Sequence, residues 1–371
     1  MPVKTSAQTN QPHAADDPAG RRAPASAAFS YRHLLGLHGV SARDIKAVLS
    51  LARRYAGHDA DGSEDPAAWR SVLRGRVVAN LFFEDSTRTR VSFSVAAKRL
   101  GAEVIDLTAM GSSVSKGETV ADTALNVAAM GVDALVMRHA SSGAPQLVVR
   151  ALESRVGAWD PDGGVPSVIN AGDGKHEHPT QGLLDAYTIA ESFSRLDGFD
   201  LSGLKVGIVG DIASSRVARS NLACLAALGA QVYFVGPPTL VPAAFEKMGA
   251  RIVHDIDAVI GELDAVNVLR IQFERHGAGG GAAGHGVAAP GAKTPSNVIA
   301  SVREYHERYG LHAARLAQLK KGAIVMHPGP INRGVEMTVN AADDKRSVVL
   351  RQVRHGVAVR MAALELCIGA R

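Results

Sequence analysis

The chain has 371 residues, too many for one ordinary hydrophobic core, so two domains are expected. Its composition is 46% hydrophobic and 21% charged, and its two cysteines, Cys224 and Cys367, exclude a disulfide framework and favour a reducing, cytoplasmic compartment. The formal net charge of +5 comes without a basic run interleaved with aromatic residues or an apolar run long enough for a bilayer, which argues against nucleic acid and membrane partners and favours small anionic ligands.

The predicted elements begin after an N-terminal stretch with almost no large apolar side chain, residues 1–28. Such a composition predicts a disordered tail, and an arm that orders against a partner subunit is the alternative. A first amphipathic helix is expected from 41 to about 55. An apolar strand, 77–81, and a helix, 91–100, then enclose the segment 82–90, whose sequence is FFEDSTRTR.

This enclosed segment has the composition of an anion site. The N-terminus of a helix presents unpaired N–H groups and a positive dipole end. Ser86, Thr87 and Thr89 add neutral donors, and Arg88 adds a bidentate fork suited to phosphate. Helix capping by Ser86 is the simpler interpretation. The concentration of donors favours anion binding over capping.

A second strand, 102–107, completes a βαβ unit, so parallel pairing with a right-handed crossover is expected. The loop 110–118 is bounded by glycine and polar within, which predicts mobility, and a helix is expected over 118–130. The next strand, 132–137, delivers Arg138 at its end. Because parallel sheets bind ligands outside the carboxyl ends of their strands, Arg138 is expected in the same pocket as the anion site.

The next strand, 166–170, leads into the run 171–181 and then a long helix to about 193. His176 and His178 form an H-x-H pair, a spacing that some metallohydrolases use. A metal site needs three or four ligands, and no further set stands at the expected strand ends. Metal binding is therefore the minor alternative, and no metal or organic cofactor is expected.

A second strand–helix series follows a polar stretch at 194–203. Arg216 and Arg219 open its first helix, a short helix is expected at 241–249, and Arg270 follows one of its strands. No G-x-G-x-x-G completes the glycine of the first strand, so NAD binding is only weakly indicated. The expected strands are 204–211, 231–235, 251–253, 264–269 and 323–326.

The last part of the chain begins with a Gly- and Ala-rich insert, 277–291, which is interpreted as disordered, with a lid as the alternative. Helical stretches to 319 precede a bend, 327–336, in which two prolines flank a glycine. A cis Gly329–Pro330 bond is plausible there, because cis bonds occur before proline. The final helix, 347–368, is expected to return to the first domain.

Cations therefore follow the strands of both series. Two anionic ligands that meet between the domains are the simplest explanation, because ligands usually lie in such clefts. The predicted fold is α/β: two doubly wound parallel-sheet domains with an interdomain active-site cleft. The arginines concerned are Arg88 and Arg138 in the first series and Arg216, Arg219 and Arg270 in the second.

The segment FFEDSTRTR resembles the carbamoyl-phosphate signature of the transcarbamylase family, and the HPTQ run at 178–181 resembles its carbamoyl-contacting segment. The resemblance covers about residues 30–370. It favours the aspartate branch over the ornithine branch, because the bend at 327–330 has no cysteine and Arg270 offers a cation where ornithine needs an acidic partner.

The resemblance implies an enzyme that transfers the carbamoyl group of carbamoyl phosphate to the amine of L-aspartate in pyrimidine biosynthesis. The implied catalytic residues are Arg88, Thr89, Lys116, Arg138 and His178. Carbamoyl phosphate would be bound by Ser86, Thr87, Arg88, Thr89, Ser112, Arg138, His178, Gln181, Pro328 and Gly329. Aspartate would be bound by Lys116, Arg216, Arg270 and Gln272. Glu84 is expected to pair with Arg216 across the closing cleft.

The implied domains are a carbamoyl-phosphate-binding domain, 29–179, completed by the C-terminal helix 347–371, and an aspartate-binding domain, 180–346. The implied assembly is a homotrimer in which Ser112 and Lys116 reach the neighbouring subunit's site. A dihydroorotase-like or regulatory chain in a larger assembly stays open, since the long tail, the insert and the HPGP bend depart from the better-known bacterial pattern.

Two rival functions are weighed against this one. A binding protein of the same fold would keep the phosphate ligands and lose His178, Arg138 or Lys116, and all three are present. A metal-dependent amidohydrolase would be sensitive to chelators.

Overall fold

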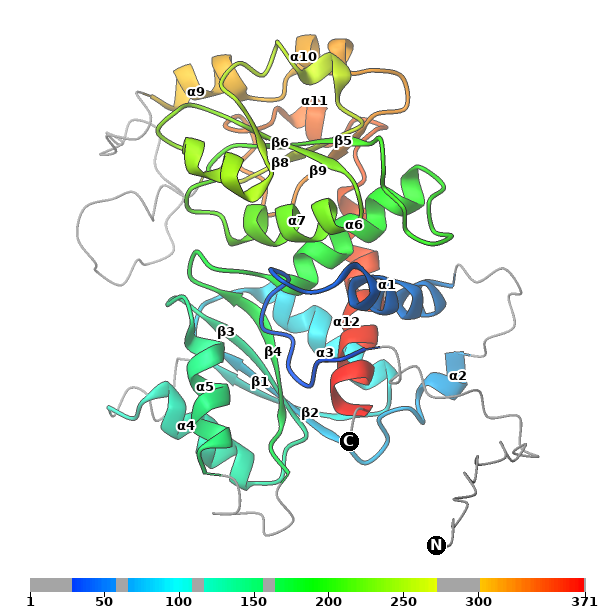
Figure 1. The fold of residues 1–371 in the computed structure, drawn as a ribbon, viewed down its shortest axis with the longest axis vertical. Helices are drawn as coiled ribbons and strands as arrows, with labels where there is room; N and C mark the ends of the chain where they lie inside the picture. The colour runs from blue at the N-terminus through cyan, green and yellow to red at the C-terminus, as the bar shows by residue number, and fades with distance from the viewer. Residues whose placement is uncertain (1–28, 58–65, 109–116, 156–163, 272–300, 370–371) are drawn as a thin grey trace, which may run out of the picture.

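The computed structural model describes residues 29–57, 66–108, 117–155, 164–271 and 301–369. It consists of two lobes, each built on a parallel β-sheet (Figure 1). Within these ranges, no helix has both the length and the apolar character needed to cross a bilayer. The tail, most of the glycine-bounded loop and the Gly- and Ala-rich insert lie outside the described residues.

The first sheet has four parallel strands in the order β2-β1-β3-β4. Its strands are β1 (Val77–Phe82), β2 (Glu103–Thr108), β3 (Ala134–His139) and β4 (Ser167–Asp173). The associated helices are α1 (Ala42–Ala56), α2 (Pro66–Trp69), α3 (Thr87–Arg99), α4 (Val120–Ala129) and α5 (Ala144–Glu153).

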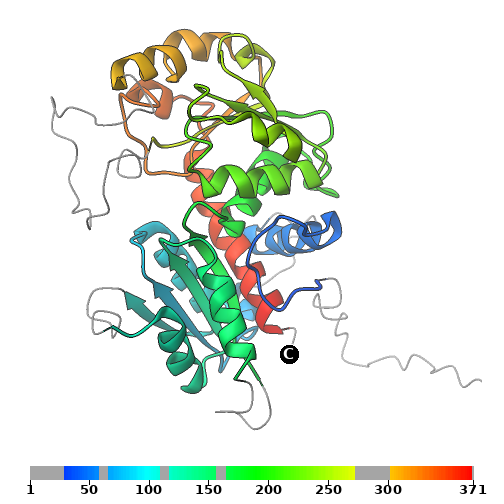
Figure 2. The ribbon, with the colours of Figure 1, turned by 60° about the vertical axis from the view of Figure 1, so that its left-hand side comes forward.

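Alternating side chains of this sheet enter two different cores, as the period of two along a strand requires. Ala79 and Leu81 of β1 pack with α4 and α5 on one face, whereas Val78 and Phe82 pack with α1 and α3 on the other. Figure 2 shows α12 (Val349–Gly369) crossing this second face. The expected return of the C-terminal helix to the first lobe is confirmed.

The second sheet has five parallel strands in the order β7-β6-β5-β8-β9. Its strands are β5 (Lys205–Val209), β6 (Gln231–Val235), β7 (Arg251–Val253), β8 (Ala265–Val268) and β9 (Ile324–Met326). Its helices are α7 (Arg216–Ala227), η3 (Ala243–Met248), η4 (Ile260–Glu262), α9 (Val302–Tyr309), α10 (Ala313–Gln318) and α11 (Val339–Ala342). Both η elements are 3-10 helices.

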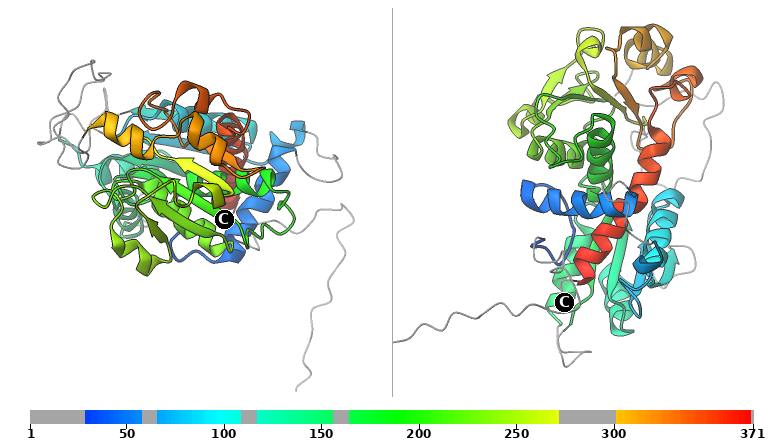
Figure 3. Two further views of the ribbon diagram at one scale, coloured as in Figure 1. Left: turned by 90° about the horizontal axis from the view of Figure 1, so that it is seen from above. Right: turned by 90° about the vertical axis from the view of Figure 1, so that its right-hand side faces the viewer.

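Two long helices connect the lobes. α6 (Pro179–Ser192) lies at the junction, and α12 runs from the upper lobe down along the first sheet (Figure 3). Their side chains belong to one continuous core with α1, α7 and the second sheet. A site between the sheets is therefore held by packed helices rather than by a linker alone.

The expected elements were found with small shifts at their ends. α3 begins at Thr87, four residues before the expected helix start, and α4 begins at Val120 because the side chain of Thr119 accepts a hydrogen bond from Asp122 N. The sequence pattern did not reveal α5, nor the short α2 and α11. The cis Gly329–Pro330 bond is confirmed.

Candidate active site

In each sheet the strand order reverses at one place. The reversal lies between β1 and β3 in the first sheet and between β5 and β8 in the second. Ligands of open parallel sheets bind outside the carboxyl ends of the strands at such reversals. Four predicted arginines occupy these positions: Arg88 after β1, Arg138 at the end of β3, Arg216 after β5 and Arg270 after β8.

One carboxylate joins the two reversal points. Glu84 Oε1 accepts a hydrogen bond from Arg138 Nη2 at 2.7 Å, and its two oxygens accept from Arg216 Nη2 and Nη1 at 2.5 and 2.9 Å. The expected pairing of Glu84 with Arg216 is confirmed, and Arg138 shares the same carboxylate. The side chains of Arg138 and Arg216 are only 11% and 7% exposed, so salt screens these pairs weakly.

A glycine lets the two guanidinium groups approach the end of β4. Gly172 has φ +115°, and a Cβ there would lie 3.0 Å from both Arg138 Nη1 and Arg216 Nε. Arg138 Nη1 also donates to the carbonyl of Ala171 at 3.1 Å. The close approach and the positive φ both require glycine at this position.

The segment before α3 is not used for capping. Ser86 occupies the N-cap position, but its side chain makes no bond to the helix N–H groups; its hydroxyl donates to Thr89 Oγ1 at 3.0 Å. Thr87 and Arg88 are exposed, and Thr89 is buried. Partial burial and, second, the charge of Arg270 lower the pKa of Arg88. Cations from the two sheets therefore face each other closely enough to repel, as expected of an anion site.

His178 lies buried beside this cluster, only 4% exposed, at the start of α6. Its backbone N–H donates to Ser220 Oγ at 2.9 Å, and its Nδ1 has no hydrogen-bond partner within the described residues. Burial, and then the charges of Arg138, Arg360 and Arg216, hold the pKa of His178 well below its usual range. His178 is therefore neutral at pH 7 and can donate one hydrogen bond.

The alternative of a metal site at the H-x-H pair has little support. His176 Nδ1 lies 3.1 Å from Asp173 Oδ2, and this hydrogen bond is the main reason why the pKa of His176 is raised. His178 has the separate, cationic surroundings described above. Throughout the described ranges, no group of three or more His, Cys, Asp or Glu side chains is arranged to hold a metal ion.

The bend after β9 closes over the anion segment. His327 Nδ1 accepts from Gly329 N at 2.7 Å, so Nε2 carries the proton and faces Glu336 Oε1 at 3.2 Å. Gly329 has φ +69°, and any Cβ there would collide with the guanidinium of Arg88. Pro328 and Gly329 are half-buried at this contact.

Gln181 is buried in the first turn of α6, and its Nε2 donates to Asp185 Oδ1 at 3.0 Å. Arg219 does not join the four arginines at the strand ends. It donates to the carbonyls of Ala213 and Ser215, and its guanidinium lies 5.2 Å from the ring centre of Phe245. Of the predicted site residues, Ser112, Lys116 and Gln272 lie outside the described residues.

The sequence analysis missed two buried charged residues near the site. Arg360 of α12 donates to Ser92 Oγ at 2.8 Å and lies over Phe93, and burial lowers its pKa to about 10. Asp185 is completely buried. Both residues lie within apolar helical runs. Most of their hydrogen-bond partners are distant along the chain, so the sequence pattern gave no indication of these pairings.

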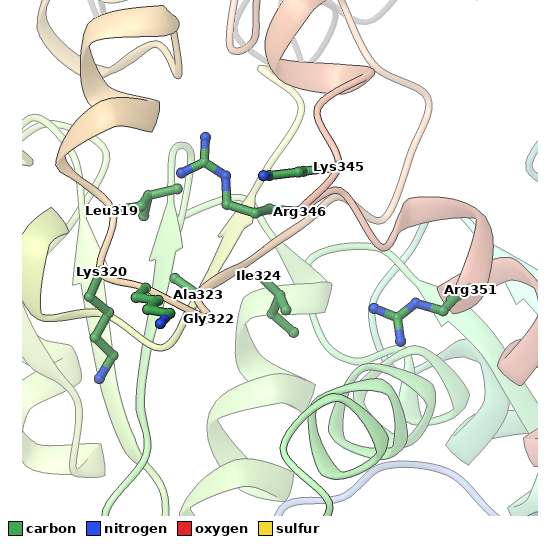
Figure 4. A pocket seen from close by; sticks show the side chains of 9 residues that line it. Leu319, Lys320, Gly322, Ala323, Ile324, Lys345, Arg346 and Arg351 are labelled. Carbon is green, nitrogen blue, oxygen red and sulfur yellow. The ribbon is translucent and has the colours of Figure 1, made fainter.

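A second cationic region lies away from this cluster. It is a surface cavity of about 630 Å³ between the end of α10, the turn before α12 and β9 (Figure 4). Its cations are Lys320, Lys321, Lys345, Arg346 and Arg351.

The fold and the cluster define a two-domain α/β protein that holds anionic groups between two parallel sheets. The chain belongs to the aspartate/ornithine carbamoyltransferase family. The family's carbamoyl-P binding domain matches residues 32–191, and its Asp/Orn binding domain matches residues 202–367.

Similar proteins include the aspartate carbamoyltransferase catalytic subunits of Myxococcus xanthus (strain DK1622) and Acidiphilium cryptum (strain JF-5), each 49% identical over 336 residues. These alignments cover 91% and 90% of this chain and 99% and 96% of the relatives. Among solved structures, aspartate transcarbamoylase from Trypanosoma cruzi in complex with carbamoyl phosphate is 28% identical with a TM-score of 0.72, covering 93% of this chain and 98% of that one. Ornithine carbamoyltransferase from Pyrococcus furiosus is 25% identical with a TM-score of 0.71, covering 92% and 98%.

Proposed function

We propose that this chain transfers the carbamoyl group of carbamoyl phosphate to the amine of L-aspartate, giving N-carbamoyl-L-aspartate and phosphate. The observation that carries the proposal is the convergence of guanidinium groups from both sheets on one place, joined through Glu84. The relatives named as aspartate carbamoyltransferases and the complex with carbamoyl phosphate support the choice of substrates.

The first lobe would bind the phosphate. Ser86, Thr87, Arg88 and Thr89 offer hydroxyl, backbone and guanidinium donors at the start of α3. Thr89, Arg138 and the neutral His178 would hold the carbamoyl oxygen, where negative charge develops as the amine attacks. The carbonyls of Pro328 and Gly329 and the Oε1 of Gln181 would accept from the carbamoyl amide.

The second lobe would bind aspartate. Arg216 and Arg270, with Gln272 and Lys116, would pair with its two carboxylates. The amine attacks the carbamoyl carbon, the bond from that carbon to the phosphate oxygen breaks, and phosphate leaves with the proton of the amine. Positioning and charge stabilisation supply the rate, so no protein base, metal or organic cofactor is required.

The proposed assembly is a homotrimer in which Ser112 and Lys116 complete a neighbour's site. The supporting observation is the exposed outer edge of the first sheet: β2 is an edge strand, and Ile105 on it is 43% exposed. The domains would be 29–179 with the C-terminal helix, and 180–346. Light scattering on the purified chain, alone and mixed with a dihydroorotase-like protein, tests both the trimer and a larger assembly. A monomer would refute the shared site.

The cytoplasm is the proposed location, where carbamoyl-aspartate would enter pyrimidine biosynthesis. Both cysteines are buried thiols, as suits a reducing compartment. Fractionation of the source cells tests this, and recovery outside the cytoplasmic fraction would contradict it.

The decisive assay measures carbamoyl-aspartate colorimetrically, with ornithine run beside aspartate at equal concentration. Product with aspartate alone supports the proposal. Product with ornithine alone would move the chain to the other branch of its family. A lack of product with either amine, together with tight carbamoyl-phosphate binding, would support a binding protein instead.

A further inference from the structure

A buried carboxylate on α6 collects four amide groups from four elements. Asp185 is 0% exposed. Its Oδ1 accepts from Gln181 Nε2 at 3.0 Å and from Gln352 Nε2 at 2.8 Å. Its Oδ2 accepts from Asn221 Nδ2 at 2.8 Å and from Asn267 Nδ2 at 3.1 Å. Each oxygen therefore receives two donors, which is the full hydrogen-bonding capacity of a carboxylate.

Two of these amides lead to the part of the site that faces the carbamoyl group. Gln181 is itself a proposed carbamoyl contact. Gln352, on α12, uses its Oε1 to accept from the backbone N–H of His327 at 3.0 Å. His327 directly precedes Pro328 and Gly329, whose carbonyls are the other proposed acceptors for the carbamoyl amide.

The other two amides lead to the aspartate side. Asn267 lies in β8, three residues before Arg270. Asn221 lies in α7, the helix that begins with Arg216. Four elements of the second lobe and of the junction, α6, α7, β8 and α12, are thus fixed to one buried group.

The direction of these hydrogen bonds matters for Gln181. A carboxylate only accepts, so the NH₂ of Gln181 must face Asp185 and its Oε1 must face away. Within the described residues, Gln181 Oε1 has no hydrogen-bond partner. Under the proposed function, this oxygen is left to accept a hydrogen bond from the carbamoyl amide.

We propose that Asp185 is a positioning residue for carbamoyl transfer: it sets the orientation of the Gln181 amide and, through Gln352, the placement of the bend at 327–330. This inference rests on the proposed function, and Asp185 itself does not touch the substrates.

The buried charge is costly to maintain, which argues for a role beyond packing. Burial raises the pKa of Asp185 to about 6, and the four amide donors oppose that rise. An apolar residue would fill the same space without the desolvation cost. The protein nonetheless has a carboxylate at this position, and each of its lone pairs accepts a hydrogen bond.

The test uses the full chain with Asp185→Asn, which keeps the shape and replaces one acceptor by a donor. In the Oδ1 position the new NH₂ opposes the NH₂ of Gln181, which is then expected to rotate and present its own NH₂ to the carbamoyl group; in the Oδ2 position it opposes Asn221 and Asn267 and disturbs the elements that precede Arg270 and follow Arg216. We expect kcat for carbamoyl-aspartate formation to fall about 100-fold. The inhibition constant of inorganic phosphate should change much less than kcat, because the four hydrogen bonds of Asp185 go to other elements and reach Arg88 only through the bend at Gly329.

A matched control lies one helical turn further along α6. Thr188 is equally buried, donates to Leu184 O at 2.7 Å and lies 2.9 Å from His355 Nδ1 of α12. Thr188→Val therefore disturbs the same pair of helices without touching a proposed substrate contact. It should lower Tm by a similar amount and leave kcat within about twofold of the wild type.

Two further variants keep the test decisive if Asp185→Asn does not fold. Gln352→Met removes one donor and the link to His327, and should lower kcat about tenfold. In a Gln181→Ala background, Asp185→Asn should lower kcat by much less than it does alone, since the route through the Gln181 amide is already lost and only the route through Gln352 remains.

The inference is overturned if Asp185→Asn and Gln352→Met match Thr188→Val in kcat, or if the Asp185 and Gln181 effects multiply. A wild-type chain that forms no carbamoyl-aspartate refutes the proposed function instead, and this inference with it.

Discussion

The two cationic regions of the molecule differ in how their charges are compensated. In the cavity of Figure 4, Lys320 lies 2.5 Å from Asp264, Arg346 lies 2.8 Å from Asp344 and Arg351 lies 3.0 Å from Glu191. These three of the cavity's five cations each pair with a different carboxylate. Most of them are also well exposed: the side chains of Lys320 and Arg351 are 39% and 48% exposed, where ion pairs contribute little.

Between the sheets, two buried guanidinium groups share the single carboxylate of Glu84, and Arg88 and Arg270 face each other. Two buried guanidinium groups that share one carboxylate thus distinguish this cluster from the more exposed pairs of the cavity. A count of basic residues does not separate the two regions, whereas burial and the sharing of one carboxylate by two guanidinium groups do.

The largest effect is expected for Arg138→Ala. Arg138 is proposed to stabilise the developing charge on the carbamoyl oxygen, and loss of one such donor typically lowers kcat about 100- to 1,000-fold. Lys345→Ala in the cavity should leave kcat within about twofold of the wild type. The measurement is the initial rate of carbamoyl-aspartate formation at saturating substrates. Equal losses in the two variants would show that the site is wrongly placed.

The next effect is expected for Glu84→Ala. Removing the shared carboxylate leaves Arg138 and Arg216 as adjacent like charges and breaks the link between the sheets. The KM for aspartate should rise about tenfold or more, equivalent to about 1.4 kcal/mol or more. Asp344→Ala breaks the cavity's ion pair with Arg346 and serves as the control. Unchanged aspartate kinetics in Glu84→Ala would contradict the proposed role.

The positions of Arg88, Arg138, Arg216 and Arg270 could be predicted because the ends of parallel strands meet at one edge of each sheet. The hydrogen-bond partners of these arginines could not be predicted from the sequence. Arg219 has the same sequence context as Arg216, yet its side chain turns back to the carbonyls of its own loop.

Asp185 shows the same limit more clearly. It stands 36 residues from Asn221, 82 from Asn267 and 167 from Gln352, and only the packed junction of α6, α7, β8 and α12 brings them together. Local sequence patterns predict where strands and helices end. They do not predict which buried polar groups pair across long separations in the sequence, because this depends on how the lobes pack.

A smaller effect is expected for Gly329→Ala. The added Cβ would displace the guanidinium of Arg88, so the KM for carbamoyl phosphate should rise about fivefold, or about 1 kcal/mol. Gly334→Ala is the matched control in the same segment. Gly334 also has positive φ, at +86°, but nothing lies within 4 Å of the new Cβ, so it carries the backbone strain without the collision. Similar KM values for the two variants would mean that strain alone explains the change.

The smallest effect is expected in the pH dependence of stability. Burial and three arginines lower the pKa of His178 in the folded chain, whereas in the unfolded chain it returns to about 6.5. The unfolded chain therefore binds a proton first as the pH falls. The stability that His178 contributes is complete above pH 6.5 and decreases below it.

Comparison with His178→Gln isolates this contribution. Asp185 acts with the opposite sign, because its raised pKa of about 6 adds stability as the pH falls toward 4, but it is common to both proteins and cancels in their difference. Urea unfolding between pH 8 and pH 5 should show the free-energy advantage of the wild type over His178→Gln shrinking below pH 6.5. An advantage that stays constant over this range would mean that His178 titrates alike in both states, and that its surroundings are not as cationic and dry as the structure indicates.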